Sequence, residues 1–260
     1  MKNTNLYVVL VVYNEYLNDI DFISRYRDSN KIKLIVVDNS TNYEIQNFNY
    51  LNSQIDGLTY ISKKVNLGLS KAYNIAISTI PLDSNNWVMT LDQDTYVSDE
   101  YIINVVEAII NNSNILVKTG LIHFGSRIGS PTLLKSRKTI NEIGIFRNIE
   151  AINSCLTINR ALLEKIDFYD ESLFLDMVDY LLFYKLRKNG FDTVEVVSGK
   201  VSQEFSGETK STYEKELHRY SIYKKDFNNY SKITGKKNIY RIFILCRRRI
   251  NLFFKYKLRN

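Results

Sequence analysis

The chain has 260 residues, 45% hydrophobic and 24% charged, with 19 Tyr, 13 Phe and 2 Pro, which excludes a disordered or fibrous protein. Its net charge of +7 is unevenly spread: residues 209–260 hold 15 Lys/Arg and 3 Asp/Glu, whereas residues 1–208 hold 20 and 25. The resulting +12 tail and −5 body argue against a general nucleic-acid binder, whose basic surface would accompany the recognition fold. A mildly acidic body with a cationic extension is expected.

Cysteine usage and hydropathy indicate the compartment. Cys155 and Cys246 are too few for a disulfide framework and lack the neighbours of a zinc site, so a reducing cytoplasm is expected. The apolar run at 6–12 lacks the cleavage site of a signal peptide, and no run approaches the roughly 18 apolar residues of a membrane span. We therefore expect a soluble or membrane-surface protein.

Strands and helices are predicted to alternate over the first 120 residues. Apolar runs typical of buried parallel strands occupy residues 6–12, 33–38, 58–62 and 87–91. Helices are predicted at 17–28, 69–80 and 99–111. Ser98 can cap the last of these helices through its hydroxyl, and Asp99 and Glu100 follow in the positive first turn, where acidic side chains are favourable. The alternation predicts an α/β sheet with a Rossmann-like first half.

The rest of the chain is predicted to contain a connection, a second region and a helical tail. Residues 120–150 hold four Gly and one Pro, with four Lys/Arg between 127 and 138, and we expect a mobile connection that closes over a ligand. Further elements are predicted as a helix at 177–188, a strand at 193–197, and tail helices at 212–230 and 238–258. We divide the chain into a body, 1–208, and a basic amphipathic tail, 209–260.

Acidic and amide side chains follow three of the predicted strands. They are Asn14 and Glu15, Asp38 and Asn39, and Asp92 and Asp94. Turns favour Asp and Asn for local reasons, but α/β sheets also bind ligands at the carboxyl ends of their strands. Asp92-Gln93-Asp94 is the most informative of these segments, since two carboxylates on alternate residues can share a hard cation such as Mg²⁺ or Mn²⁺.

Four segments in this order, VVLVVYNE, LIVVDNST, KKVNLGLSKAYNIAI and WVMTLDQDT, resemble glycosyltransferase family 2, the inverting enzymes of the GT-A fold. The match covers roughly residues 6–207. The resemblance implies a nucleotide-sugar donor, a divalent metal and one catalytic base. It also implies an α/β fold with a mixed central sheet, in which 1–120 bind the nucleotide sugar and 121–208 bind the acceptor.

The resemblance assigns donor contacts by position. Tyr13, Asn14 and Glu15 would line the base and ribose site, and Asp38 would bond the nucleobase. Asn66, Gly68 and Lys71 would lie near the ribose and diphosphate, with Gln93 also on the donor side. Asp92 would touch the ribose or the metal, and Asp94 would be the main metal ligand. For Lys71, a solvated helix face is an equally good interpretation.

The base and the acceptor site are assigned to the second half. FLDMVDY followed by YLLFYKLRKNGF is similar to the family segment that carries the base, which makes Asp179 the first candidate and Asp176 the second. The two are three residues apart on one helical face, so either can reach the cleft. Asn153-Ser154-Cys155 lies where the family often has a Ser-Gly pair near the donor sugar and acceptor, with Cys155 in place of the glycine.

A third metal ligand is expected near the end of the body. Many relatives have a His three residues before the glycine that corresponds to Gly207, and this chain has Glu204 there. Glutamate can bind Mg²⁺ or Mn²⁺ as well as imidazole can. An exposed loop acid is an equally good interpretation of Glu204.

These assignments imply a reaction mechanism, and a closer resemblance indicates the donor sugar. Asp179 would take the proton of an acceptor hydroxyl, which attacks the anomeric carbon opposite the departing diphosphate and inverts the configuration. LDQDT, FLDMVDY and RYSIYKKD are most similar to the bacterial rhamnosyltransferase branch, which uses dTDP-L-rhamnose. A UDP-sugar donor, for transfer of a hexose or galactofuranose, is the alternative, because a few pocket contacts set specificity in this fold.

The tail predicts a membrane-surface contact. Apolar side chains alternate with Arg and Lys in RIFILCRRRINLFFKYKLR, as in helices that lie on anionic membranes. This fits a peripheral enzyme at the inner face of the cell membrane, acting on a lipid-linked saccharide during synthesis of a bacterial surface polysaccharide. The alternative is that the apolar stripe packs on the body or on a second subunit in a homodimer.

Two other functional classes compete with this interpretation. A sugar-nucleotide pyrophosphorylase is also an α/β nucleotide-binding protein, but it usually carries a Gly-rich loop after the first strand, where VVYNEYLND has no glycine. A nucleic-acid-binding protein acting through its tail would need an aromatic and basic platform that the body lacks. We therefore expect no nucleic-acid partner.

Overall fold

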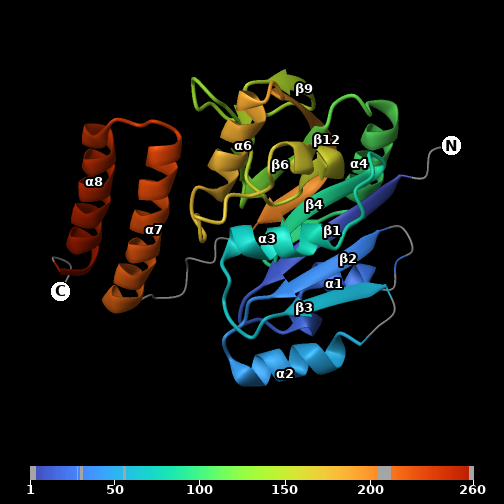
Figure 1. Cartoon of the computed structure of the whole chain (residues 1–260), viewed down its shortest axis with the longest axis horizontal. Helices are drawn as coiled ribbons and strands as arrows, with labels where there is room; N and C mark the ends of the chain where they lie inside the picture. The colour runs from blue at the N-terminus through green and yellow to red at the C-terminus, as the bar shows by residue number, and fades with distance from the viewer. Residues whose placement is uncertain (1–3, 28, 30–31, 55–56, 204–211, 258–260) are drawn as a thin grey trace.

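A computed structural model describes residues 4–27, 29, 32–54, 57–203 and 212–257. Its centre is a mixed sheet with the strand order β3-β2-β1-β4-β11-β6-β12-β5, flanked by helices on both faces (Figure 1). The α/β class with a mixed central sheet and a helical C-terminus is therefore confirmed. The strands of the first half are β1 (Asn5–Val12), β2 (Lys33–Asp38), β3 (Leu58–Ser62), β4 (Asn86–Asp92) and β5 (Thr95–Val97).

The first four strands lie parallel to one another and end at one edge of the sheet. Val12 of β1 pairs with Asp38 of β2, and Val11 pairs with Asp92 of β4. Five of the six β2 residues are buried, because central strands of a covered parallel sheet are apolar on both faces. The register therefore brings the polar residues that follow β1, β2 and β4 to the same edge.

Helices cover the two faces of this sheet. They are α1 (Asp21–Tyr26), α2 (Tyr43–Asn52), α3 (Leu69–Ser78), α4 (Asp99–Asn111), α5 (Arg160–Lys165) and α6 (Val178–Lys188). Alternate residues of β1 and β2 enter two separate cores, one with α1 and α4 and the other with α3, α5 and α6. Ser98 caps α4 as expected, since its Oγ accepts the Tyr101 N–H at 3.2 Å.

The second half adds antiparallel and parallel strands to the central sheet, and two of its strands, β8 and β10, pair with each other in a separate two-stranded sheet. The strands of this half are β6 (Val117–Phe124), β7 (Arg127–Ser130), β8 (Thr132–Leu133), β9 (Gly144–Arg147), β10 (Ile149–Glu150), β11 (Leu156–Asn159) and β12 (Thr193–Gln203). The expectation of a mobile connection over 120–150 is therefore wrong. Gly125, with φ +59°, turns β7 back onto β6, and β9 pairs with β12, so most of this segment is sheet.

Two element boundaries also differ from the sequence prediction. The helix expected at 17–28 is a 3-10 turn, Leu17–Asp19, followed by α1, because Ile20 is extended between them. The strand expected to end at 197 continues to Gln203 across a bulge between Val197 and Val201. Gly199 lies in this bulge with φ +123°. In the sequence a glycine at this position suggests a turn, but in the structure the bulge keeps the strand in the sheet.

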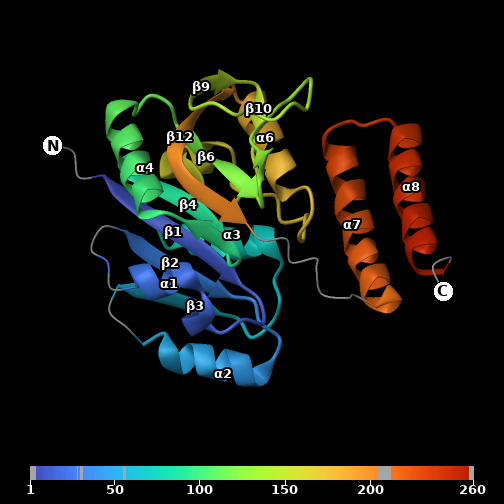
Figure 2. The same ribbon diagram turned by 180° about the vertical axis from the view of Figure 1, so that it is seen from behind.

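The C-terminal part is a helical hairpin of α7 (Tyr213–Ile233) and α8 (Asn238–Lys257). Figures 1 and 2 show the hairpin at one end of the molecule, with α7 next to α6 and α8 outermost. Tyr223, Phe227 and Tyr230 of α7 join the same core as α3 and α6. None of the helices in the described part of the chain is both long and apolar enough to cross a bilayer.

We expect the substitution Gly199→Ala to destabilise the fold by about 3 kcal/mol or more, since it combines backbone strain with overpacking. A Cβ at Gly199 would lie 2.5 Å from the Tyr101 Cα, and a helix backbone cannot move aside as a side chain can. Urea unfolding measures the effect.

The matched control is Gly190→Ala, where φ is +83° but a Cβ would meet nothing within 4 Å. Only conformational strain applies there, which costs about 1 kcal/mol. Equal losses of unfolding free energy in the two variants would contradict the close approach of β12 and α4.

Candidate functional site

Asn14 ties together the loops that follow β1 and β2. Its side-chain oxygen accepts the N–H groups of Thr41 at 2.9 Å and Asn42 at 3.1 Å, and its own N–H donates to the Ser40 Oγ at 2.8 Å. Its φ of +51° is in the left-handed region, which Asn tolerates better than most residues. Asn14 therefore shapes the edge of the sheet from which ligand contacts are expected.

Tyr13 and Glu15 flank Asn14 in different environments. The Tyr13 N–H donates to Gln93 Oε1 at 2.7 Å, which links the β1 loop to the loop after β4, while the Tyr13 side chain is 46% exposed. Glu15 is partly buried, and its carbonyl accepts from Asn49 at 2.9 Å. The exposed Tyr13 ring is thus available to a ligand at this edge.

Asp38 is buried at the end of β2. One carboxylate oxygen accepts the Ser40 N–H at 2.8 Å, and the other accepts from Asn49 at 2.9 Å and from the Tyr60 hydroxyl at 2.7 Å. The Asp38 charge raises the pKa of Tyr60, although burial of that phenol is the larger cause. In this structure Asp38 organises the loop, and its contact with a nucleobase stays a prediction.

The segment before α3 is held from both sides. Asn66 Oδ1 accepts the Gly68 N–H at 2.9 Å, and Asn39 donates to the Gly68 carbonyl at 3.2 Å. Gly68 has φ +78°, and a Cβ there would lie 2.6 Å from the Phe174 ring. Lys71 is exposed on the first turn of α3. The glycine thus permits close packing of the 174 segment against the start of α3.

The Asp92-Gln93-Asp94 motif lies where β4 ends. The Gln203 amide nitrogen, at the end of β12, donates to Asp92 at 3.2 Å and to Asp94 at 2.9 Å. The Ser154 hydroxyl donates to the same Asp92 oxygen, Oδ2, at 2.5 Å, and the Tyr73 hydroxyl donates to the other, Oδ1, at 3.3 Å. Because one N–H₂ group bridges both carboxylates, Asp92 and Asp94 face the same point.

Asp179 lies on the first turn of α6 and is close to Asp92. Its side chain is partly buried, and one oxygen accepts the Tyr180 N–H at 2.8 Å. Desolvation, with smaller contributions from the charges of Asp92 and Glu150, raises the pKa of Asp179 to about 7. A carboxylate with such a pKa is matched to general base work near neutrality.

Two buried tyrosines join these carboxylates. Burial raises the pKa of Tyr73 and of Tyr169, and the charges of both Asp92 and Asp179 add to the rise. The two rings lie 4.9 Å apart between centroids. The structure thus brings the β4 motif and the start of α6, which are far apart in sequence, to one partly dry site.

Asp176 is in a different environment from Asp179. Both of its oxygens bond the Arg219 guanidinium of α7, one at 2.8 Å, and its side chain is 13% exposed. It does not cap α6, whose N-cap is Met177 with φ +63°. Because Arg219 already occupies both Asp176 oxygens, this geometry favours Asp179 as the base.

Asn153, Ser154 and Cys155 are buried beside the β4 motif. Asn153 accepts from the Thr90 hydroxyl at 2.7 Å through its carbonyl, and its side chain is 3.4 Å from the Tyr169 hydroxyl. Cys155 has φ +57°, a left-handed conformation, which explains why a glycine suits this position. Burial raises the pKa of the Cys155 thiol to about 11, so this sulfur is not a reactive thiolate.

Sequence reasoning did not find the site residues Tyr73 and Gln203, and it noted Asn39 after a strand without giving it a role. Asn39, Tyr73 and Gln203 contact predicted site residues directly. Asn39 carried a signal in its position after β2, whereas Tyr73 has the pattern of a core residue and Gln203 lies beyond the predicted end of its strand. Glu204, a predicted metal ligand, lies outside the described residues. Within those residues no group of three His, Cys, Asp or Glu side chains can hold a metal.

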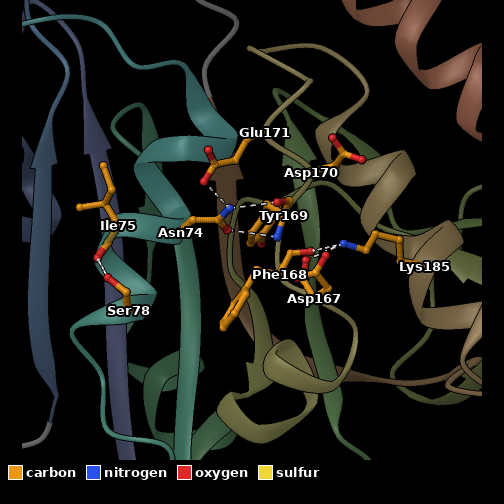
Figure 3. Close-up of a pocket in the computed structure, with 9 residues that line it drawn as sticks. All are labelled: Asn74, Ile75, Ser78, Asp167, Phe168, Tyr169, Asp170, Glu171 and Lys185. Atoms are coloured by element: carbon orange, nitrogen blue, oxygen red, sulfur yellow. Dashed lines mark hydrogen bonds between the residues drawn. The ribbon is translucent and has the colours of Figure 1, made fainter.

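A separate surface pocket of about 580 Å³ lies between α3 and the loop before α6 (Figure 3). Asn74 donates to the Tyr169 carbonyl at 2.9 Å, and Lys185 donates to the carbonyls of Asp167 and Phe168. None of the predicted site residues lines this pocket. Lys185, six positions after Asp179, therefore supports the loop and does not face the carboxylate cluster.

Comparisons with known proteins show what the chain resembles in sequence. The model of the family "Glycosyl transferase family 2" matches residues 7–169. A curated relative, the dTDP-rhamnosyl transferase RfbF of Shigella flexneri, is 24% identical over 196 residues, which are 68% of this chain and 61% of that protein. The chain thus spans about three fifths of the length of this relative.

Solved structures share the fold. GalNAc-T7, determined with UDP, GalNAc and Mn²⁺, superposes with a TM-score of 0.60 at 16% identity, over 80% of this chain and 46% of that one. S. aureus TarS gives a TM-score of 0.55 at 18% identity, over 98% of this chain and 45% of that one. At these identities the likeness is evidence for the fold alone.

The substitution Asp179→Asn is expected to stabilise the protein, and more at pH 8 than at pH 5. The folded-state pKa of about 7 lies above the ordinary value of 3.8, so ionisation costs more in the folded chain and wild-type stability falls as pH rises between these values. Since one pKa unit corresponds to about 1.4 kcal/mol, a gain of at least ~1 kcal/mol is expected at pH 8. Thermal unfolding at both pH values tests this, and a loss of stability in the variant at pH 8 would contradict the burial of an ionised Asp179.

Proposed function

The chain belongs to glycosyltransferase family 2, and on that premise we propose that it transfers a sugar from a nucleotide-sugar donor to a saccharide acceptor with inversion. The observation that carries the proposal is the carboxylate cluster. Burial raises the pKa of Asp179 to about 7, and the charge of Asp92, at the edge where β1, β2 and β4 end, adds to the rise. Ligand sites of open α/β sheets lie at such edges.

The donor binds across this edge. The exposed Tyr13 ring provides a stacking surface for the base, and the loop held by Asn14 and buried Asp38 shapes the pocket beneath it. Gly68 and Lys71, at the start of α3, face the diphosphate, where the positive end of the helix dipole and the Lys71 cation favour negative charge. Gln93 fixes the Tyr13 backbone and so belongs to the same pocket.

A divalent cation, Mg²⁺ or Mn²⁺, is part of the proposal. The fit rests on Asp92 and Asp94, whose oxygens converge on the one Gln203 amide nitrogen, so they present hard oxygen ligands to a common point. Asp94 is the main ligand, with Glu204 as a further candidate. When bound, the cation neutralises charge on the leaving diphosphate.

The chain's own residues perform the remaining steps. Asp179 accepts the proton of the attacking acceptor hydroxyl, for which its raised pKa is suited. Ser154 and Tyr73 hold the orientation of the Asp92 carboxylate. Asn153, Ser154 and Cys155 form the wall between donor sugar and acceptor, and the Asn153 backbone is fixed by Thr90. Asp176 remains the second candidate for the base.

L-Rhamnose from dTDP-rhamnose is the proposed donor sugar, because the curated relative RfbF of Shigella flexneri is a dTDP-rhamnosyl transferase. A UDP-linked hexose or galactofuranose is the alternative donor, because a few pocket contacts set the specificity in this fold. The acceptor is a lipid-linked saccharide of a bacterial surface polysaccharide. The protein acts in the cytoplasm at the inner face of the membrane.

The outward face of α8 is the proposed membrane contact. Its exposed apolar side chains are Ile239, Ile242, Phe243, Ile250, Phe253 and Phe254. The opposite face packs on α7, through Leu245 and through Arg248, whose guanidinium lies 3.6 Å from the Tyr223 ring centroid. Arg247 and Arg249 flank the apolar stripe, and two +12 tails repel each other, which favours an anionic lipid surface over a second copy of the chain.

A screen of nucleotide sugars tests the enzymatic proposal. We expect transfer or slow hydrolysis of one donor, dTDP-rhamnose first, with Mn²⁺ and none with EDTA. Asp179→Asn is expected to lower kcat by at least about 10³-fold and keep donor binding, because the base acts only in the chemical step. Donor turnover that survives both EDTA and Asp179→Asn would overturn this mechanism.

Sedimentation with anionic vesicles tests the membrane contact. Because burying a Phe side chain is worth about 2 kcal/mol, Phe243→Ser with Phe253→Ser should weaken binding at least tenfold. The matched control is Ile103→Ser with Ile110→Ser, two exposed apolar residues of α4. Unchanged vesicle binding of the α8 variant, with dimers in size-exclusion chromatography, would assign the face to a second copy.

A further inference from the structure

Asp226 of α7 is a fully buried carboxylate whose partners lie on one distant loop. Its Oδ1 accepts the Phe174 N–H at 2.9 Å, and its Oδ2 accepts the N–H groups of Leu175 and Asp176, both at 2.8 Å. Hydrogen bonds to an ionised group are roughly twice as strong as neutral ones, and a buried charge is tolerated only when it is bonded in this way. The α7 helix therefore grips this loop through three consecutive backbone donors.

Other contacts of α7 reach the same loop. Arg219 pairs with the Asp176 carboxylate, and Asn229 donates to the Ser172 carbonyl at 2.8 Å. Arg219, Asp226 and Asn229 lie within three turns of one helix, so they align along one face of α7. The loop at 172–177 is bonded at both its beginning and its end by this one face.

The loop at 172–177 is connected to two parts of the candidate site, the start of α6 with Asp179 and the start of α3 with Gly68. Met177, a non-glycine residue with φ +63°, turns the chain into α6, and Asp179 follows two residues later. On the other side, the Phe174 carbonyl accepts the Leu69 N–H at 2.5 Å, beside Gly68. A strained left-handed Met costs about 1 kcal/mol or more, so it persists only where neighbouring bonds determine the backbone.

We propose that Asp226 is a positioning residue for the base: α7 fixes the loop at 172–177, and the loop fixes Asp179 against Asp92. In this account α7 works as part of the catalytic body, although it follows the boundary at 208, and only α8 remains for surface contacts. The inference rests on the proposed function of Asp179, whereas the grip of α7 on the loop does not.

Asp226→Asn is the first test. The amide turns an N–H₂ toward backbone donors that need an acceptor, so the loop loses at least one bond and Asp179 gains access to water. We expect kcat to fall at least tenfold. The apparent pKa of the rising limb of the pH–rate profile should lie below that of wild type, because a better-solvated carboxylate ionises more easily.

Hydrogen exchange supplies a readout that does not depend on activity. The amides of Phe174, Leu175 and Asp176 are expected to exchange at least tenfold faster in Asp226→Asn, with the β4 amides unchanged. Arg219→Gln, a partly exposed position that leaves the Asp226 bonds intact, should shift kcat and the pH profile in the same direction by a smaller factor. The Arg219→Gln variant keeps the test decisive if Asp226→Asn does not fold.

The control is Glu214→Gln, an exposed residue of α7 that loses the same charge and is expected to match wild type in every readout. Faster exchange of the loop with unchanged kcat and pH profile would overturn the positioning role. Unchanged exchange would overturn the grip itself. If wild type transfers no sugar while the exchange rates change as expected, the proposed function fails and the structural part of the inference stands.

Discussion

The desolvation of Asp179, to which the charge of Asp92 adds, is the constraint on which the candidate site depends. Asp92 ends a strand of the parallel half, and Asp179 starts a helix of the second half, so only the assembled fold brings them together. Burial makes ionisation of Asp179 costly, and the Asp92 charge adds to that cost. The fold therefore holds a carboxylate with a raised pKa, which accepts a proton near neutral pH, and its burial lowers the folding stability.

The surrounding residues keep this unfavourable pair in place. Ser154, Tyr73 and Gln203 bond Asp92, so its orientation is fixed by α3, by β12 and by the turn before β11. On the other side, the loop before α6 is bonded to α3 through Phe174 and to α7 through Asp226. Protein sites commonly hold functional groups against repulsion or strain by such redundant bonding.

Local patterns of the sequence were sufficient for the parallel half and its motifs. The runs that form β1, β2 and β4, and the polar residues after them, follow from alternation and strand ends, and the family resemblance is confirmed. What could not be predicted depends on distant contacts. Gln203 lies beyond a bulge that reads as a turn, and Asp226 reads as an exposed helical acid until its three partners are known. The left-handed Cys155 shows why a glycine fits there, although its sequence position alone did not reveal it.

The pKa of Asp179 is the most direct measure of this account. Carbon-13 NMR of protein labelled at the Asp carboxyl groups, in the absence of metal, follows each carboxyl through its titration, and the signal missing in Asp179→Asn identifies this residue. The account predicts a midpoint near pH 7 for that signal. A midpoint near 4, as for a solvated carboxyl group, would contradict a desolvated base held beside Asp92.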